Sequence, residues 1–143
     1  MTSPREVRDP REAGALCDLV PLNGKRPVWP TRARASAGAR LVILAESPGE
    51  QEIALGAPLV GPSGMRLDKT LERLGASRAQ AHLTNTLLCR PPAVFSTTQW
   101  KLAIACCHPR LQAELFPLGT KTVVALGGRA LYSLTGKQKI LDW

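Results

Sequence analysis

The sequence predicts an α/β fold, because three strand-like segments alternate with helix-like segments along its 143 residues. Two of these segments, Leu41–Ala45 and residues 122–126, are short continuous apolar runs, as in the central strands of parallel sheets. Between the strand-like segments, apolar residues recur at helical spacing. Parallel strands joined by right-handed crossovers carry helices on both faces, so we expect a three-layer α/β/α arrangement with a parallel central sheet.

The first strand leads into a connection over residues 46–62 that is rich in Pro and Gly, and a helix is expected after it. Ser63 is the expected N-cap of this helix and Gly75 its expected stop. The spacing that predicts this helix is that of Leu67, Thr70, Leu71 and Leu74, at i, i+3, i+4 and i+7.

A second strand is expected over residues 81–88, where two prolines end it. The next helix is expected to begin after a cap at Thr97 or Thr98, and Pro109 should kink or divide it. The third strand is followed by a short helix over residues 129–136.

We expect one domain over residues 1–143, because a chain of this length can bury a core of its own. Residues 1–39 form an N-terminal segment with one cysteine and several basic side chains, and residues 40–143 form the α/β core. A short helix is expected within residues 1–16, and an irregular connection over residues 20–39.

The composition indicates a basic globular protein, since 44% hydrophobic and 21% charged residues argue against wholesale disorder. The formal net charge of +8 favours an anionic partner, above all nucleic acid, although a scattered basic surface is the alternative. No apolar run approaches the roughly 20 residues of a membrane helix, and the N-terminus lacks the apolar core of a secretory signal. We therefore expect a cytoplasmic protein without a membrane partner.

The residues expected at the carboxyl edge of the sheet carry the candidate chemistry, because ligands of open α/β sheets bind there. Glu46 directly follows the first strand, where a carboxylate can position water or stabilise a cationic transition state. Glu52 is close enough in sequence to share that pocket, whereas Glu50 and Glu52 are both solvated loop charges in the alternative interpretation. Asn85 ends the second strand, and its amide suits the edge of a planar heterocycle or, alternatively, a turn cap.

The four cysteines are Cys17, Cys89, Cys106 and Cys107. In a cytosolic protein they are buried thiols or metal ligands rather than a disulfide framework. The chain has no CxxC pair, so spacing alone favours ordinary core cysteines.

Five segments, in this order, together resemble the uracil-DNA glycosylase superfamily, and within it the iron–sulfur-containing family 4. They are AESPGEQE, GAPLVGPSGMRLDKTLERLG, LTNTLLCRPP, ACCHPRLQAELFP and TVVALGGRAL. The resemblance implies a DNA repair enzyme that hydrolyses the N-glycosidic bond of uracil in single- or double-stranded DNA. It would act as a monomer, after the target nucleotide has been flipped into a pocket.

The resemblance also implies roles for particular residues. Glu46 matches the catalytic acidic residue, and Glu52 matches a second acidic residue that assists with water or geometry. Ser47 is implied to contact the base through the backbone of its turn, and Asn85 to recognise the uracil edge. Leu59 stands where the family has a phenylalanine that stacks on the base.

Three of the four cysteines implied to bind a [4Fe–4S] cluster are present, namely Cys17, Cys89 and Cys107. Val20 stands at the fourth position. Such clusters usually have four cysteine ligands, so Cys106, Asp18 or solvent would complete the set, or the site would be empty and packed.

The family pattern continues beyond this sequence into a fourth strand and a loop whose histidine stabilises the leaving base. His82 and His108 belong to other motifs, so neither is expected in that role. A catalytically impaired nucleic-acid-binding relative of the same fold is therefore the alternative function. An unrelated α/β protein is a third interpretation.

Overall fold

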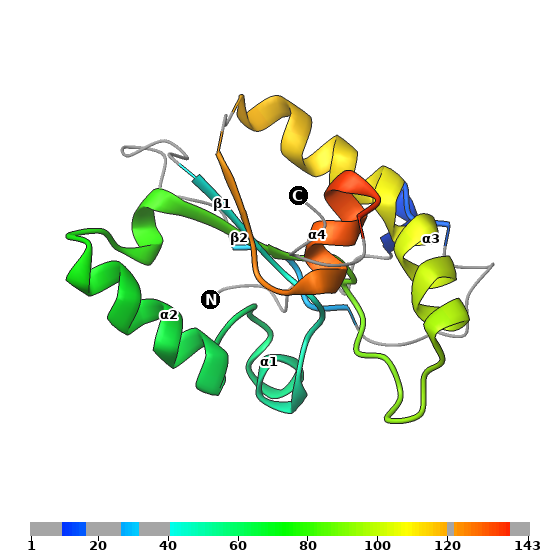
Figure 1. Cartoon of the computed structure of the whole chain (residues 1–143), viewed down its shortest axis with the longest axis horizontal. Helices are drawn as coiled ribbons and strands as arrows, with labels where there is room; N and C mark the ends of the chain where they lie inside the picture. Colours follow the sequence, from blue (N-terminus) through cyan, green and yellow to red (C-terminus); the bar gives the residue numbers. More distant parts are fainter. Residues whose placement is uncertain (1–9, 17–26, 32–40, 120–121, 138–143) are drawn as a thin grey trace, which may run out of the picture.

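A computed structural model describes residues 10–16, 27–31, 41–119 and 122–137. Its sheet has three parallel strands, β1 (Leu41–Ala45), β2 (Ala81–Asn85) and β3 (Val123–Ala125), in the order β2-β1-β3 (Figure 1). The central position of β1 explains its apolar sequence, because a strand with helices on both faces has no solvent-facing side.

The register of the strands brings their carboxyl ends to one edge. Ala45 pairs with Asn85, and Leu44 pairs with Ala125. The pairing continues past β2, where the Thr86 N–H donates to the Ala45 carbonyl at 2.8 Å. The connections that follow the three strands therefore start side by side.

Four α-helices and three 3₁₀ turns surround the sheet in the described part of the chain. The α-helices are α1 (Glu50–Leu55), α2 (Pro62–Arg73), α3 (Thr97–Leu115) and α4 (Gly128–Thr135). The 3₁₀ turns are η1 (Pro10–Ala13), η3 (Arg78–Gln80) and η4 (Phe116–Leu118). None of the helices among the described residues has both the length and the apolar character to span a membrane.

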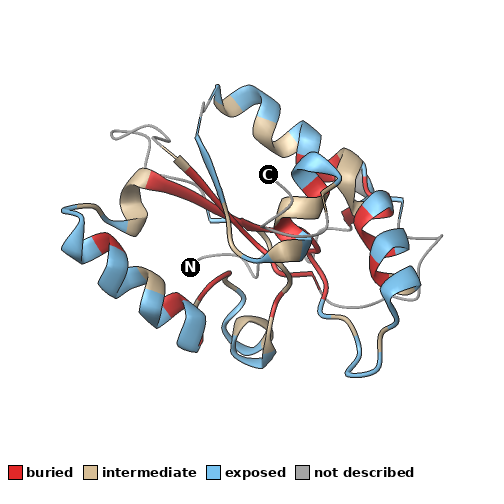
Figure 2. Cartoon of the chain, viewed as in Figure 1, coloured by how far each residue is buried: buried red, intermediate tan, exposed pale blue. Residues whose placement is uncertain are grey.

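Two apolar clusters cover opposite faces of the sheet, which confirms the predicted three layers. On one face Ile43 packs with Leu71 of α2. On the other face Leu44 packs with Leu111 of α3 and Ala130 of α4. Figure 2 shows the buried positions concentrated along β1 and β2 and on the sides of α3 and α4 that face them.

The helix α1 was not predicted, because its sequence reads as a loop. Gly49 is its N-cap, and Gly56 ends it in the left-handed conformation with φ 69°. A side-chain contact supplies what local propensity lacks, since the Glu52 carboxylate accepts the Gly49 N–H at 3.1 Å.

The boundaries of three other elements differ from the prediction. β2 ends at Asn85 rather than at residue 88, because the chain leaves the ladder there to follow the β1 edge. Gly61 rather than Ser63 is the N-cap of α2, with Pro62 in its first turn. Ser96 rather than a threonine caps α3, where it forms a capping box with Gln99.

Pro109 does not divide α3, which is one helix from Thr97 to Leu115. The two residues that follow the proline, Arg110 and Leu111, are 2% and 1% exposed. Burial of this stretch against the sheet offsets the one backbone hydrogen bond that proline cannot donate.

The N-terminal predictions fall largely outside the described residues. Within residues 1–16 the structure describes only residues 10–16, which contain the turn η1. Within residues 20–39 it describes residues 27–31, where Pro27 bridges to Cys89 and Thr31 to Leu83. Cys17, Asp18 and Val20 lie outside the described residues.

Candidate active site

A pocket of about 420 Å³ lies at the carboxyl end of β1. Four of the residues predicted for the site line it, namely Glu46, Ser47, Glu52 and Leu59. Its walls come from the start and the end of the β1–α2 connection (residues 46–61) and from the residue after β3, Leu126. The pocket therefore opens where the parallel sheet predicts a ligand site.

The carboxylate of Glu46 makes an ion pair with Arg129 of α4, with 3.0 Å between Oε1 and NH1. The guanidinium of Arg129 also lies 3.9 Å above the ring of Trp100, in cation–π geometry. Because the two side chains are 38% and 45% exposed, the ion pair contributes little to stability. The ion pair instead orients the carboxylate of Glu46. Arg129 itself was not predicted, although the order of strands and helices in the sequence places the start of α4 at the same edge of the sheet as Glu46.

Glu52 organises the β1–α2 connection. Its Oε1 accepts the N–H groups of Val60 at 3.2 Å and Gly61 at 3.0 Å, while Oε2 accepts that of Gly49. One carboxylate thus ties together the two ends of the connection. This arrangement favours a positioning role for Glu52, and its predicted catalytic assistance stays a prediction. Glu50, the neighbouring carboxylate, is exposed.

Leu59 is buried at 5% exposure and has a left-handed backbone, with φ 54°. Among the described residues it is the one non-glycine with positive φ, a conformation that costs such a residue of order 1–3 kcal/mol. Two contacts maintain it. Arg78 donates to the Leu59 carbonyl, and that carbonyl packs on Gly64, where a Cβ atom would lie only 1.8 Å away.

Asn85 is 2% exposed, and its side-chain Nδ2 has no hydrogen-bond partner among the described residues. Since Ala45 and Asn85 are register partners, their side chains leave the same face of the sheet, and Ala45 lines the pocket. Asn85 itself is not among the lining residues. A buried amide donor without a partner at this edge is a candidate for ligand contact.

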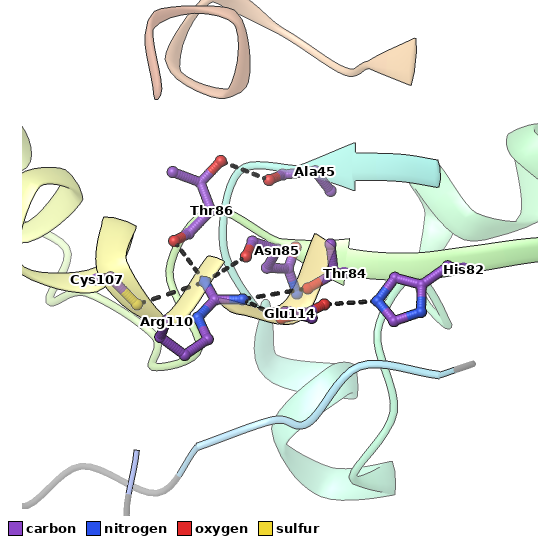
Figure 3. Close-up of polar contacts among 8 residues, drawn as sticks. All are labelled: Ala45, His82, Thr84, Asn85, Thr86, Cys107, Arg110 and Glu114. Atoms are coloured by element: carbon purple, nitrogen blue, oxygen red, sulfur yellow. Dashed lines mark hydrogen bonds and ion pairs between the residues drawn. The ribbon is translucent and has the colours of Figure 1, made fainter. Parts of the chain in front are cut away.

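Behind Asn85 lies a buried polar network that was not predicted (Figure 3). Arg110 NH1 donates to Glu114 Oε2 at 2.6 Å, and Glu114 Oε1 lies 2.6 Å from His82 Nε2. Burial alone would raise the pKa of Glu114, but the hydrogen bond with His82 and the charge of Arg110 outweigh it and keep that pKa below its ordinary value.

Three of the four cysteines lie among the described residues, and none of the three forms a disulfide bond there. Cys89 is buried, and the half-buried Cys107 accepts a hydrogen bond from Arg110 NH2 at 3.4 Å. Burial, and secondarily the adjacent Cys107, raises the pKa of Cys106, which disfavours it as a thiolate ligand. The described residues contain no group of three His, Cys, Asp or Glu that could bind a metal ion. They therefore do not by themselves fit a cluster, and the predicted ligand Cys17 lies outside them.

The fold is thus a three-layer α/β/α sandwich, with an acidic turn and a buried amide at the carboxyl edge of its parallel sheet. A model of the uracil DNA glycosylase superfamily matches residues 34–141. The chain therefore belongs to the uracil DNA glycosylase superfamily, as the resemblance of its motifs predicted.

Its curated relatives include type-4 uracil-DNA glycosylases. That of Pyrobaculum aerophilum is 32% identical in an alignment of length 126 that covers 85% of this chain and 62% of the relative. That of Thermotoga maritima is 36% identical over 101 residues, 71% of this chain and 52% of the relative. That of Sulfurisphaera tokodaii is 33% identical over 109 residues, 72% and 49% respectively. The matched region thus spans about half to three fifths of these relatives.

We expect the substitution Gly64→Ala to destabilise the protein by at least about 1–3 kcal/mol, the usual cost of overpacking. The added methyl group meets the rigid carbonyl of Leu59 rather than a side chain that can rotate away. Urea denaturation measures the change, with Ser63→Ala at the exposed neighbouring position as the control. Equal stability of the two variants would contradict this close contact.

The lowered pKa of Glu114 predicts an acid-sensitive contribution to stability. The contribution is fully present above the unfolded glutamate pKa of about 4.3 and is lost as the pH falls through the lower folded value. Glu114→Gln should therefore be less stable than the wild type at neutral pH and should lose less further stability on acidification. Urea midpoints of the wild type and of Glu114→Gln, measured from neutral pH to below the unfolded glutamate pKa, give the loss of stability with pH for each protein. An equal loss in both would contradict the lowered pKa of Glu114.

Proposed function

We propose that this chain hydrolyses the N-glycosidic bond of uracil in DNA. The observation that carries the proposal is the juxtaposition of Glu46, at the pocket after β1, with the unpartnered amide of Asn85, at the end of the adjacent strand. Hydrolysis of this bond needs both kinds of group, because positive charge develops on the sugar and negative charge on the leaving base.

In this proposal the target nucleotide leaves the base stack and enters the pocket. The carboxylate of Glu46 faces the sugar, where it stabilises the developing positive charge and orients the attacking water. Leu59 supplies an apolar wall for the base, in place of an aromatic ring. The amide Nδ2 of Asn85 donates to a carbonyl oxygen of the uracil and stabilises negative charge there as the bond breaks.

Two further features support a DNA substrate. The chain carries a formal net charge of +8, which attracts the phosphate backbone. The type-4 relatives are named as glycosylases of uracil in DNA, and the match with them covers most of this chain. Arg129 contributes a cation beside the Glu46 carboxylate and, being 45% exposed, is accessible to a ligand from the solvent side.

We expect Glu46→Gln to lower the rate of uracil excision by about 10²–10⁴-fold, because the amide loses the negative charge while keeping the shape. Excision is measured by incubating a uracil-containing oligonucleotide with the protein and cleaving abasic sites with alkali. Glu72→Gln, at an exposed position of α2 outside the pocket lining, is the control and should retain full activity.

An intact oligonucleotide after incubation with the wild-type chain would contradict the proposed activity. If such a chain still binds DNA tightly and in a salt-sensitive way, the function is that of a non-catalytic nucleic-acid-binding relative.

An iron–sulfur cluster is a separate part of the proposal, with Cys17, Cys89 and Cys107 as its ligands. Anaerobically purified protein should then contain iron and sulfide and show broad visible absorbance. Cys107→Ser should remove the colour, whereas Cys106→Ser should retain it, because burial favours the protonated form of that thiol. A folded wild-type protein without iron would contradict this part and leave the catalytic proposal standing.

A further inference from the structure

Arg110 is the largest fully buried side chain among the described residues, with 2% exposure. Its guanidinium connects α3 to the carboxyl end of β2 (Figure 3). NH2 donates to the backbone carbonyls of Asn85 and Thr86, both at 2.9 Å. NH1 donates to Glu114 and, at 3.4 Å, to the hydroxyl of Thr84.

The positive charge of Arg110 is neutralised by an ion pair with one carboxylate, that of Glu114. Glu114, one helical turn further along α3, provides the counter-charge, and His82 binds the other carboxylate oxygen. A buried ion pair of this kind is rarely a net gain in stability compared with apolar side chains. The guanidinium also contacts the Thr84 hydroxyl and Cys107 Sγ, both at 3.4 Å, but its shortest remaining contacts are those with the two successive carbonyls of Asn85 and Thr86.

The peptide unit between Asn85 and Thr86 is fixed from two sides. On the β1 side, the N–H and the hydroxyl of Thr86 both donate to the Ala45 carbonyl, at 2.8 and 3.0 Å. On the α3 side, Arg110 binds the carbonyl of this unit, that of Asn85, and the next carbonyl along the chain, that of Thr86. The regular register between β1 and β2 ends at Ala45 and Asn85, so Arg110 binds the chain where the strand gives way to the connection.

Side-chain alternation then sets the direction of Asn85. Thr84 contacts Arg110, so its side chain leaves the face of the sheet that α3 covers. The next side chain, that of Asn85, leaves the opposite face, the same one as Ala45 of the pocket lining. A rotation of the peptide group between Asn85 and Thr86 would change the direction of the side-chain amide of Asn85.

We propose that Arg110 is a positioning residue for base recognition: by fixing the Asn85–Thr86 peptide it holds the Asn85 amide in the orientation that contacts uracil. The inference rests on the proposed function, in which Asn85 recognises the base. It assigns Arg110 a role in discrimination, in addition to any role in stability.

The test compares Arg110→Lys with Glu114→Gln, both in a Glu46→Gln background that prevents turnover. Lysine retains the positive charge beside Glu114 but lacks the planar fork that spans two carbonyls. Glutamine at position 114 disrupts the same buried ion pair but leaves Arg110 on the Asn85 and Thr86 carbonyls. The two variants therefore perturb one network and differ in the contact with the peptide.

The measured quantity is the affinity for a single-stranded oligonucleotide with one uracil, divided by the affinity for the same strand with an abasic site. We expect Arg110→Lys to lower this ratio by about tenfold, in line with the loss of one good base contact. Glu114→Gln should change the ratio less than about twofold. This corresponds to a change of less than about 0.5 kcal/mol in the difference between the two binding free energies. Affinity for the abasic strand should be similar in both variants.

The double variant Arg110→Met with Glu114→Gln covers the case in which lysine prevents folding. It removes both buried charges and leaves an amide to bind His82, so the fold tolerates the change better than a single unpaired charge. It should show the same loss of discrimination as Arg110→Lys. Hydrogen exchange should also be faster at the Thr86 amide, which lies in the unit that Arg110 fixes.

Two negative results are distinguishable. If the Glu46→Gln parent does not discriminate uracil from an abasic site, the proposed function is contradicted, and the role of Arg110 in recognition with it. If the parent discriminates and the Arg110 variants discriminate equally well, the role of Arg110 alone is contradicted.

Discussion

The register of β1 against β2 is the constraint on which the site depends. Because Ala45 lies beside Asn85, the two connections that leave these strands start from the same edge of the sheet. The hydrogen bond from the Leu87 N–H to the Glu46 carbonyl, at 3.1 Å, extends the pairing into the connections themselves. A slip by one residue would turn every side chain of one strand to the opposite face. The side chains of Ala45 and Asn85 would then no longer leave the same face of the sheet.

Around this edge of the sheet, single charged side chains fix the backbone of the connections through hydrogen bonds, where no helix or strand does so. Glu52 binds three backbone N–H groups at both ends of the β1–α2 connection. Arg78 binds the carbonyls of Leu59 and Gly64, and Arg110 those of Asn85 and Thr86. Each satisfies backbone groups that neither a helix nor a strand can pair at that point. The pocket thus has fixed walls although part of its lining belongs to no helix or strand.

Features encoded in neighbouring residues were predictable from the sequence, and features that join distant ones were not. The apolar run of β1 and the position of Asn85 at the end of β2 follow from local pattern, and both agree with the structure. The pairing of Arg129 with Glu46 spans 83 positions, and the contacts of Arg110 with β2 span about 25, so no periodicity reveals them. The helix α1 was missed for a related reason, since its stability comes from Glu52 rather than from its glycine caps.

The left-handed backbone of Leu59 sets two contributions to stability against each other. Glycine or asparagine would adopt this conformation at lower cost. The leucine side chain, however, is buried in the apolar cluster that contains Ile43 and Leu71, and truncating such a side chain costs about 2–5 kcal/mol. Its burial therefore outweighs a backbone cost of order 1–3 kcal/mol. Because the same residue also lines the pocket, a substitution at position 59 changes the core and the pocket wall together.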